Sequence, residues 1–282
     1  MDQMDLQARI DAATTLIEDR LDEDVPLEEL ARAACYSMFH FHRLFRATTG
    51  ETVRQYARRL RMERAAYQLT FGTDEIVRIA FDAGYDSHEA FTRAFKAHFD
   101  ITPSAFRDER REVCIDHVHE TEFSMEVQIR HRDPVQIAYV RHVGPYDQAA
   151  ETWKALMKWG WMKLLRKPEI FGLSYDDPEV TDPDEVRYEA CMVVDKAKPK
   201  GNVQVRMFEG GDYAVVIHEG PYENFPETYN TLCARITSEP IDGVQYELAE
   251  PPALEKYLND PRKTKPEDLR TEVWMPVKRS EA

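Results

Sequence analysis

The chain has 282 residues and a formal net charge of −15 at pH 7. That length favours about two domains and allows a sizeable core. No apolar run reaches the roughly 18 residues of a membrane span, and the N-terminus "MDQMDLQARI" does not resemble a signal peptide, so we expect a cytoplasmic protein. The cysteines are far apart and lack CxxC spacing, which argues against structural zinc and a disulfide framework: Cys35, Cys114, Cys191 and Cys233.

The negative charge is distributed unevenly. Residues 1–111 carry 16 basic and 20 acidic side chains, and the remaining residues carry 21 and 32. Between Val25 and Thr70, however, eight arginines stand against four acids. Attraction to phosphate depends on such a local basic surface rather than on the total charge, so the acidity does not exclude DNA binding. A merely solvated arginine-rich helix would have the same composition.

The first hundred residues predict helices. Apolar residues at helical spacing predict a helix over residues 5–21, and later helices are expected at 27–34, 37–48 and 52–69. Gly50 is a suitable C-terminal stop. Thr73 or Asp74 is expected to cap the next helix, and "ITPSAFRDER" predicts a short closing helix.

Two stretches of this helical part repeat each other. "LARAACYSMFHFHRLFR" (residues 30–46) returns as "IAFDAGYDSHEAFTRAFK" (79–96), with one more residue in the turn. Each copy is typical of a helix-turn-helix, with a second helix opened by a capping serine, Ser37 or Ser87. The second helix of that motif enters the DNA major groove, so two copies would contact groove segments about 34 Å apart.

Beyond about residue 111 the pattern changes to strands, which predicts a linker at 112–121 and a second domain at 122–282. "IAYVRHVGPYDQAAETW" (137–153) resembles "YAVVIHEGPYENFPETY" (213–229), and "YDDPEVTDPDEVRYEACMVV" (175–194) resembles "LNDPRKTKPEDLRTEVWMPV" (258–277). We therefore expect an all-α N-terminal domain of residues 1–111, followed by an α+β domain. In the latter, two strand-helix-strand-strand modules are related by a pseudo-twofold axis.

The last strand of each half carries an acid. A two-residue period puts Thr271 and Val273 on the side that packs against helices, and Glu272 and Trp274 on an open face, with Glu189 at the matching position of the first half. A partly desolvated carboxylate beside aromatic rings favours a cation. Candidate walls for such a site are Trp274, Tyr146, Tyr222 and Tyr257. The alternative is that both acids pair with Arg187 or Arg270, or lie in solvent.

Other chemistry is weakly indicated. His142 and His218 occupy matching strand positions but lack ligands at metal spacing, so we expect no metal site. The sequence contains no GxSxG, Walker or GxGxxG motif, so we expect no cofactor, no catalytic residue and no enzymatic activity.

Residues 6–107 closely resemble the AraC/XylS-type DNA-binding domain, in which seven helices hold two helix-turn-helix units. The matching residues run through both repeats, from "LARAACYSMFHFHRLFRATTGETVRQYARRLRMERAAYQL" to "IAFDAGYDSHEAFTRAFKAHFDITPSAFR". The resemblance implies that the groove-facing positions are Phe39, His40, His42 and Arg43 in the first unit and His88, Glu89, Thr92 and Arg93 in the second. It places Arg46 and Lys96 near phosphates. Cys35 departs from the family, which usually has glycine there, as Gly84 provides in the second unit.

Residues 122–277 resemble the gyrase-inhibitor-like (GyrI-like) effector-binding domain. The resemblance rests on the "GPY" turns and the "YLNDP…TEVWMPV" ending. It implies a sheet cleft that binds lipophilic organic cations, with an acid on the final strand as the counter-charge. That acid corresponds to Glu272, and its pseudo-symmetric partner to Glu189.

We therefore expect a transcription regulator that binds operator DNA and senses a small lipophilic cation, with RNA polymerase as a further candidate partner and no membrane. One alternative is a GyrI-like hydrolase of a small reactive compound, using Glu272 with Tyr257 or Tyr222. Another is an effector-independent domain that contacts a protein. The operator, the regulated genes, the sign of regulation, the effector and the oligomeric state do not follow from the sequence.

Overall fold

The computed structural model describes residues 3–110, 125–160, 168–250 and 252–280, so the predicted linker at 112–121 lies outside the described residues. The chain divides into two compact units. Unit 1 comprises Met1–Leu69, Thr73–Phe106 and Pro199–Gln204, and unit 2 comprises Thr70–Gly72, Arg107–Lys198 and Val205–Ala282. No helix in the described part of the chain is long and apolar enough to cross a membrane.

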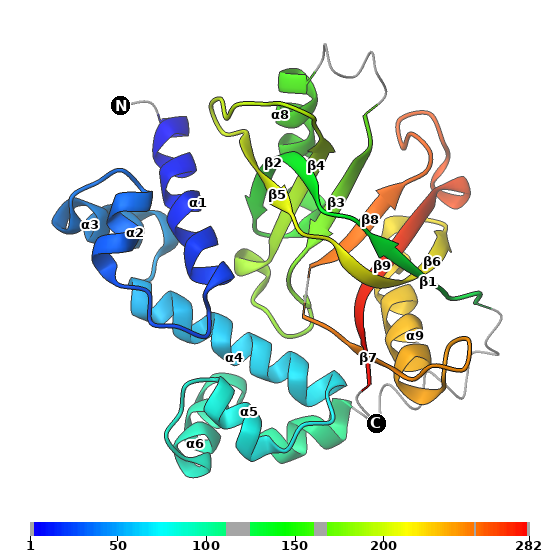
Figure 1. The fold of residues 1–282 in the computed structure, drawn as a ribbon, viewed down its shortest axis with the longest axis horizontal. Coiled ribbons are helices and arrows are strands. Elements are labelled where there is room, and N and C mark those ends of the chain that lie inside the picture. Colours follow the sequence, from blue (N-terminus) through cyan, green and yellow to red (C-terminus); the bar gives the residue numbers. More distant parts are fainter. Residues whose placement is uncertain (1–2, 111–124, 161–167, 251, 281–282) are drawn as a thin grey trace. The chain divides into compact units, whose positions relative to one another are not determined.

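Unit 1 is helical, as the apolar spacing predicts (Figure 1). Its helices are α1 (Gln3–Asp19), α2 (Leu27–Ala33), α3 (Met38–Thr49), α4 (Val53–Phe71), α5 (Ile76–Asp82) and α6 (His88–Phe99). Residues 103–110 are helical too. The expected cap at Thr73 or Asp74 is wrong, because Glu75 holds the N-cap position of α5 and forms no side-chain cap. Ser87 caps α6 by accepting a hydrogen bond from the Ala90 amide at 3.2 Å, whereas Ser37 forms no such bond on α3.

The two helix-turn-helix units have matching cores. Phe41 and Phe45 of α3 are fully buried with ring centroids 5.5 Å apart, and Phe91 and Phe95 of α6 repeat the pair at 5.5 Å. At the turn, Cys35 has φ 57° and Gly84 has φ 81°. A side chain in this left-handed conformation costs roughly 1–2 kcal/mol, which glycine avoids, so the first turn is the more strained of the two.

Unit 2 is built on one antiparallel sheet covered by two helices (Figure 1). The strands are β1 (Gln128–Arg132), β2 (Val135–Val143), β3 (Ile170–Ser174), β4 (Arg187–Val193), β5 (Gln204–Phe208), β6 (Gly211–Glu219), β7 (Tyr246–Leu248), β8 (Ala253–Tyr257) and β9 (Arg270–Arg279). The helices are α8 (Ala150–Gly160), which packs on β2 and β4, and α9 (Phe225–Ser238), which packs on β6, β7 and β9.

The strand order shows the predicted duplication. The path β1-β6-β9-β8-β3-β4-β2-β5 has the same sequence of equivalent strands from either end, with β7 attached to β9. Each half contains the expected strand-helix-strand-strand module, β2-α8-β3-β4 or β6-α9-β8-β9. One feature exceeds the prediction: β1 pairs with β6 of the second half, and β5 pairs with β2 of the first. The halves therefore exchange their first strands.

The pseudo-twofold axis can be located from the strand register. Gly172 corresponds to Glu255 when the repeat is extended at its offset of 83 residues, and the two are also directly paired between β3 and β8. A residue that pairs with its own counterpart must lie on the axis relating the halves. Glu255 is therefore the carboxylate at the centre of the sheet.

Gly172 is required by a close approach. A Cβ at this position would lie 2.2 Å from the Tyr188 hydroxyl oxygen and 2.7 Å from its ring. The absent side chain lets the phenol ring of Tyr188 lie over β3, at the middle of the sheet.

Gly172→Ala is expected to destabilise the protein by about 1–3 kcal/mol through overpacking against Tyr188. Urea unfolding would measure this free energy in the wild-type background and in Tyr188→Ala, where the clashing ring is gone. The alanine should cost much less in the second background. An equal cost in both would contradict the packing explanation.

Candidate nucleic-acid interface and ligand site

Helix α3 exposes the residues expected to face DNA. Phe39 is 76% exposed, and His40, His42, Arg43 and Arg46 are exposed as well. The Arg43 guanidinium carbon lies 5.9 Å from the Phe39 ring centroid. An arginine can bond the edge of guanine and an apolar ring can contact the thymine methyl group, so this pair suits the major groove.

Helix α6 presents a similar but less complete surface. Glu89, Arg93 and Lys96 are exposed, whereas His88 is half-buried. The Thr92 hydroxyl is buried and has no hydrogen-bond partner among the described residues. The charged side chains of α6 are thus the ones that solvent, and hence a duplex, can reach.

Much of the arginine counted in the sequence is not part of this surface. On α4, Arg59 pairs with Glu51 and Glu63 at 3.1 Å each. Arg61 donates to the Leu21 carbonyl at 2.7 Å, and Arg64 donates to an Asp22 carboxylate oxygen at 2.6 Å. The bonds of Arg61 and Arg64 attach α4 to the segment after α1, and Arg59 pairs with Glu51 before α4 and with Glu63 within it, so the three arginines stabilise the fold.

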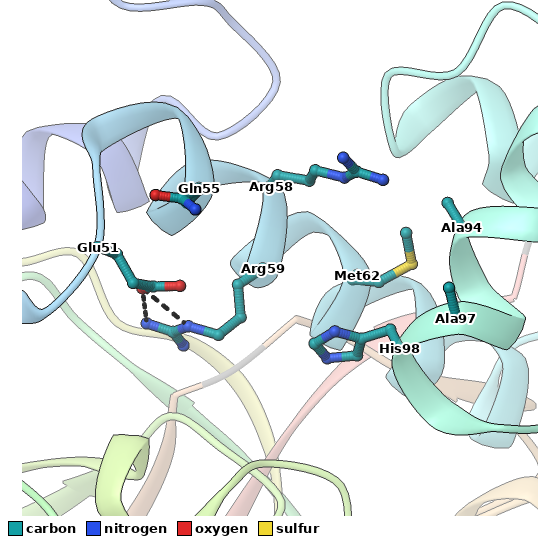
Figure 2. Close-up of a pocket in the computed structure, with 8 residues that line it drawn as sticks. All are labelled: Glu51, Gln55, Arg58, Arg59, Met62, Ala94, Ala97 and His98. Carbon is teal, nitrogen blue, oxygen red and sulfur yellow. Dashed lines mark hydrogen bonds and ion pairs between the residues drawn. The ribbon is translucent and has the colours of Figure 1, made fainter.

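A shallow hollow lies between α4 and α6 (Figure 2). Its lining residues are Glu51, Gln55, Arg58, Arg59, Met62, Ala94, Ala97 and His98. Figure 2 shows Glu51 bonded to Arg59 on one side and the short side chains of Ala94 and Ala97 on the other. The Arg58 guanidinium donates to the Tyr85 hydroxyl at 3.1 Å, and this bond links α4 to the second helix-turn-helix unit.

In unit 2, the strand register divides the predicted ligand residues between the two faces of the sheet. Tyr257 pairs with Thr271, and Lys256 pairs with Glu272. Paired residues share a face, so Tyr257 and Glu255 lie with Thr271 on the side covered by α8 and α9, which we call the helix face. Glu272 lies on the opposite side, the inner face. The expectation that Thr271 packs toward the helices is confirmed.

Glu189 lies on the inner face and is fully buried. Its carboxylate accepts hydrogen bonds from Arg141 at 3.0 Å, from Arg206 at 2.8 Å and from the Tyr175 hydroxyl at 2.9 Å. Two guanidinium groups and a hydroxyl therefore surround this acid.

Glu272 has a similar but lighter set of partners. Its side chain is 12% exposed and accepts from Arg130 at 2.8 Å and from the Trp274 indole N–H at 3.1 Å. Trp274 is itself buried, with its ring 5.8 Å from that of Tyr213, in the core cluster of the inner face. The prediction that this face is open is therefore wrong, because apolar side chains fill it.

One arginine partner of each acid comes from an exchanged strand. Arg130 lies on β1 and Arg206 on β5, at equivalent positions 76 residues apart. The alternative pairing with Arg187 or Arg270 is wrong, because Arg187 binds Asp176 at 2.9 Å and Arg270 binds Glu219 at 3.0 Å.

A third acid, Glu255, was not anticipated from the sequence. It is buried on the helix face and accepts hydrogen bonds from Ser174 at 2.9 Å, Tyr257 at 2.9 Å and Tyr229 of α9 at 3.1 Å. Among the described residues, no basic side chain lies within 4.0 Å of its carboxylate. Extending the comparison of the halves by three residues, to Gly172 opposite Glu255, would have revealed it.

The tyrosines expected at the ligand site lie around Glu255. The Tyr257 hydroxyl, which donates to Glu255, also lies 2.9 Å from the Tyr188 hydroxyl. The Tyr222 ring lies 5.7 Å from that of Tyr257, and the Tyr146 ring lies 5.8 Å from that of Tyr188. The structure thus brings Tyr146, Tyr222 and Tyr257 together, apart from Glu189, Glu272 and Trp274.

Burial dominates the electrostatics of this cluster. It raises the pKa of Glu255, although the hydroxyl donors of Ser174, Tyr257 and Tyr229 act in the opposite direction. Burial, with the nearby Glu255 charge, raises the pKa of Tyr222 to about 12. The tyrosines are therefore neutral hydroxyl donors around a carboxylate whose ionisation is costly.

The described residues contain no group of three or more histidine, cysteine, aspartate or glutamate side chains placed to hold a metal ion. His218 illustrates this, because its two ring nitrogens lie 2.7 Å from the Thr228 hydroxyl and 3.2 Å from the Pro221 carbonyl oxygen. It has the bonds of a buried structural histidine.

Comparison with known proteins agrees with this architecture. Residues 125–278 match the GyrI-like small molecule binding domain, and residues 30–109 match a helix-turn-helix domain. Over 91 residues, 32% of the chain, it is 40% identical to the transposon Tn10 TetD protein of Escherichia coli, covering 66% of it. Over an equal length it is 34% identical to the multiple antibiotic resistance protein MarA of Escherichia coli (strain K12), covering 72% of it.

The chain spans between 31% and 66% of the length of the first curated relatives it matches. Among solved structures, it is similar to the EcmrR C-terminal domain, with 18% identity and a TM-score of 0.43 over 56% of this chain and all of that one.

Two helix-turn-helix units joined to a small-molecule-binding domain define a DNA-binding regulator with a sensing domain. The chain belongs to the AraC-type transcription regulators that carry a GyrI-like domain.

Glu255→Gln is expected to raise the Tm at about pH 8 and to lose this advantage toward about pH 4. The raised pKa means that the folded protein binds the Glu255 proton more tightly than the unfolded chain. This group's contribution to stability is therefore complete below its ordinary pKa and is lost as the pH rises through the folded-state pKa. Thermal unfolding across this range tests it, and a pH-independent difference in Tm would contradict it.

Proposed function

We propose that Arg43 and Arg93 make the base contacts that give this regulator its operator preference. The observation that carries this proposal is their exposure on the second helix of each helix-turn-helix unit. Arg46 and Lys96, also exposed, would bind phosphates and fix the register of each helix without reading the sequence. The exposed Phe39 adds an apolar contact that the second unit lacks, since Glu89 occupies the equivalent position there.

For unit 2, we propose a lipophilic organic cation as the effector, with Glu255 as its counter-charge. Glu255 is buried, bonded to hydroxyl groups and without a basic partner within 4.0 Å in the described part of the chain. A cation placed here would add a direct charge interaction to the longer-range influence of His218, and would favour the ionised carboxylate. The rings of Tyr146, Tyr222 and Tyr257 add cation–π attraction of about 0.5–2 kcal/mol each.

Glu189 and Glu272 suit this role less well. Each already pairs with an arginine, and an incoming cation would have to displace it. For the buried Glu189–Arg141 pair, removing one partner costs about 3–5 kcal/mol, more than a typical cation–π contact returns. We propose that these two acids hold the exchanged strands in place.

We propose further that unit 2 acts by binding rather than by turnover, and that the protein works in the cytoplasm, where promoter DNA lies. Control of transcription then requires that the effector favour one state of the protein over another. Contact with RNA polymerase stays a prediction.

Arg43→Ala is expected to weaken binding to operator DNA by more than tenfold, since a good arginine–guanine pair is worth about 1–3 kcal/mol. The operator would be selected from random duplexes with the wild-type protein, and affinities measured by gel shift. Arg32→Ala, which removes an exposed arginine of α2, is the matched control and should bind normally. Wild-type affinity in Arg43→Ala would refute the assignment.

Tetraphenylphosphonium, a lipophilic cation, is expected to raise the Tm of the wild type. At a ligand concentration of 100 times Kd, it should stabilise the folded protein by about 2.7 kcal/mol. Glu255→Gln should abolish this shift because it removes the counter-charge, whereas Glu272→Gln should keep it. Loss of the shift only in Glu272→Gln would move the effector to the inner face.

A further inference from the structure

Next to Glu255, one buried polar group has no partner. Thr271 of β9 is 0% exposed, and its hydroxyl forms no hydrogen bond with any residue that the structure describes. Burying a hydroxyl without a partner costs about 1–3 kcal/mol, so proteins avoid it where nothing is gained.

The neighbours of Thr271 explain why its hydroxyl is left over. Thr271 is paired with Tyr257 on β8 and with His218 on β6, so it lies between them on the helix face. The Tyr257 hydroxyl is engaged with Glu255 and Tyr188. Both ring nitrogens of His218 are within hydrogen-bond distance of other groups. The adjacent polar groups are thus directed elsewhere.

In the first half of the domain, the residue equivalent to Thr271 forms hydrogen bonds within the protein. The counterpart of Thr271 is Tyr188, 83 residues earlier, which pairs with His142 and Ser174 in the same register. The Tyr188 hydroxyl lies 3.2 Å from the Trp153 indole nitrogen, which donates to it, and 2.9 Å from the Tyr257 hydroxyl. The second half replaces this bonded group with a shorter side chain whose hydroxyl stays unbonded.

We propose that Thr271 determines effector specificity by forming a hydrogen bond to a polar group of the bound molecule. This inference rests on the proposed binding of a cation at Glu255. Glu255 and Thr271 are diagonal neighbours on adjacent strands, a separation of about 7–8 Å between backbones. The effector is therefore a lipophilic cation that also carries a hydroxyl, ether or carbonyl group about 5–8 Å from its charge.

A measurement without ligand tests whether the Thr271 hydroxyl lacks a partner in the protein. Thr271→Val keeps the shape of the side chain and removes its hydroxyl, so it should raise the Tm by roughly 2 °C if the hydroxyl has no partner. Thr271→Ser, which retains the hydroxyl, should not. A lower Tm in Thr271→Val would show that the hydroxyl is bonded within the protein and would overturn the inference.

A matched pair of probes tests whether Thr271 bonds a polar group of the bound molecule. The wild type should bind 4-hydroxyphenyltrimethylammonium about threefold to tenfold more tightly than phenyltrimethylammonium, measured by calorimetry. Thr271→Val should remove this preference by weakening only the hydroxylated probe, and Thr271→Ser should keep it. A preference that persists in Thr271→Val would overturn the assignment.

The two proposals fail in different ways. If Glu255→Gln binds both probes as tightly as the wild type, the cation site at Glu255 is refuted, and the inference about Thr271 falls with it. If both probes depend on Glu255 but the wild type does not distinguish them, only the role of Thr271 is refuted.

Discussion

The sensing domain depends on one constraint, the close approach of the Tyr188 ring to Gly172 at the pseudo-twofold axis of the duplicated sheet. Gly172 and Glu255 are counterparts and direct partners, and the absent side chain of the glycine leaves its space to the ring of Tyr188. Tyr188 then lies across Gly172 and reaches the hydroxyl of Tyr257, which bonds Glu255. A symmetric framework thereby acquires one acidic group at its centre.

Away from the axis, the same symmetry is preserved and serves stability. Arg130 bonds Glu272 and Arg206 bonds Glu189, each arginine lying on the strand that its half gives to the other. The domain thus contains two kinds of buried acid. We propose that Glu189 and Glu272, which have arginine partners, hold the exchanged strands, and that Glu255, which has hydroxyl partners, is the counter-charge of the ligand.

The sequence allowed the helical unit to be predicted well because its signals are local: helical spacing, the repeated turn and Gly50. Counting arginines overestimated the DNA-facing charge, because Arg59 pairs with Glu51 and Glu63, and Arg64 pairs with Asp22. In unit 2 the modules and the direction of Thr271 followed from periodicity. The exchange of β1 and β5 did not, since no local pattern encodes which strand a distant segment pairs with. Glu255 was missed because the repeat fades around Gly172, where the two halves differ most.

The exchanged strands also change what holds the domain together. Between β4 and β5 the chain passes through a loop with three exposed lysines, Lys196, Lys198 and Lys200. Cleavage of the backbone there would leave β1 hydrogen-bonded to β6, and β5 hydrogen-bonded to β2. Each of the two fragments would therefore still contribute a strand to the half formed by the other. We therefore expect the two halves to stay associated without the covalent link between them.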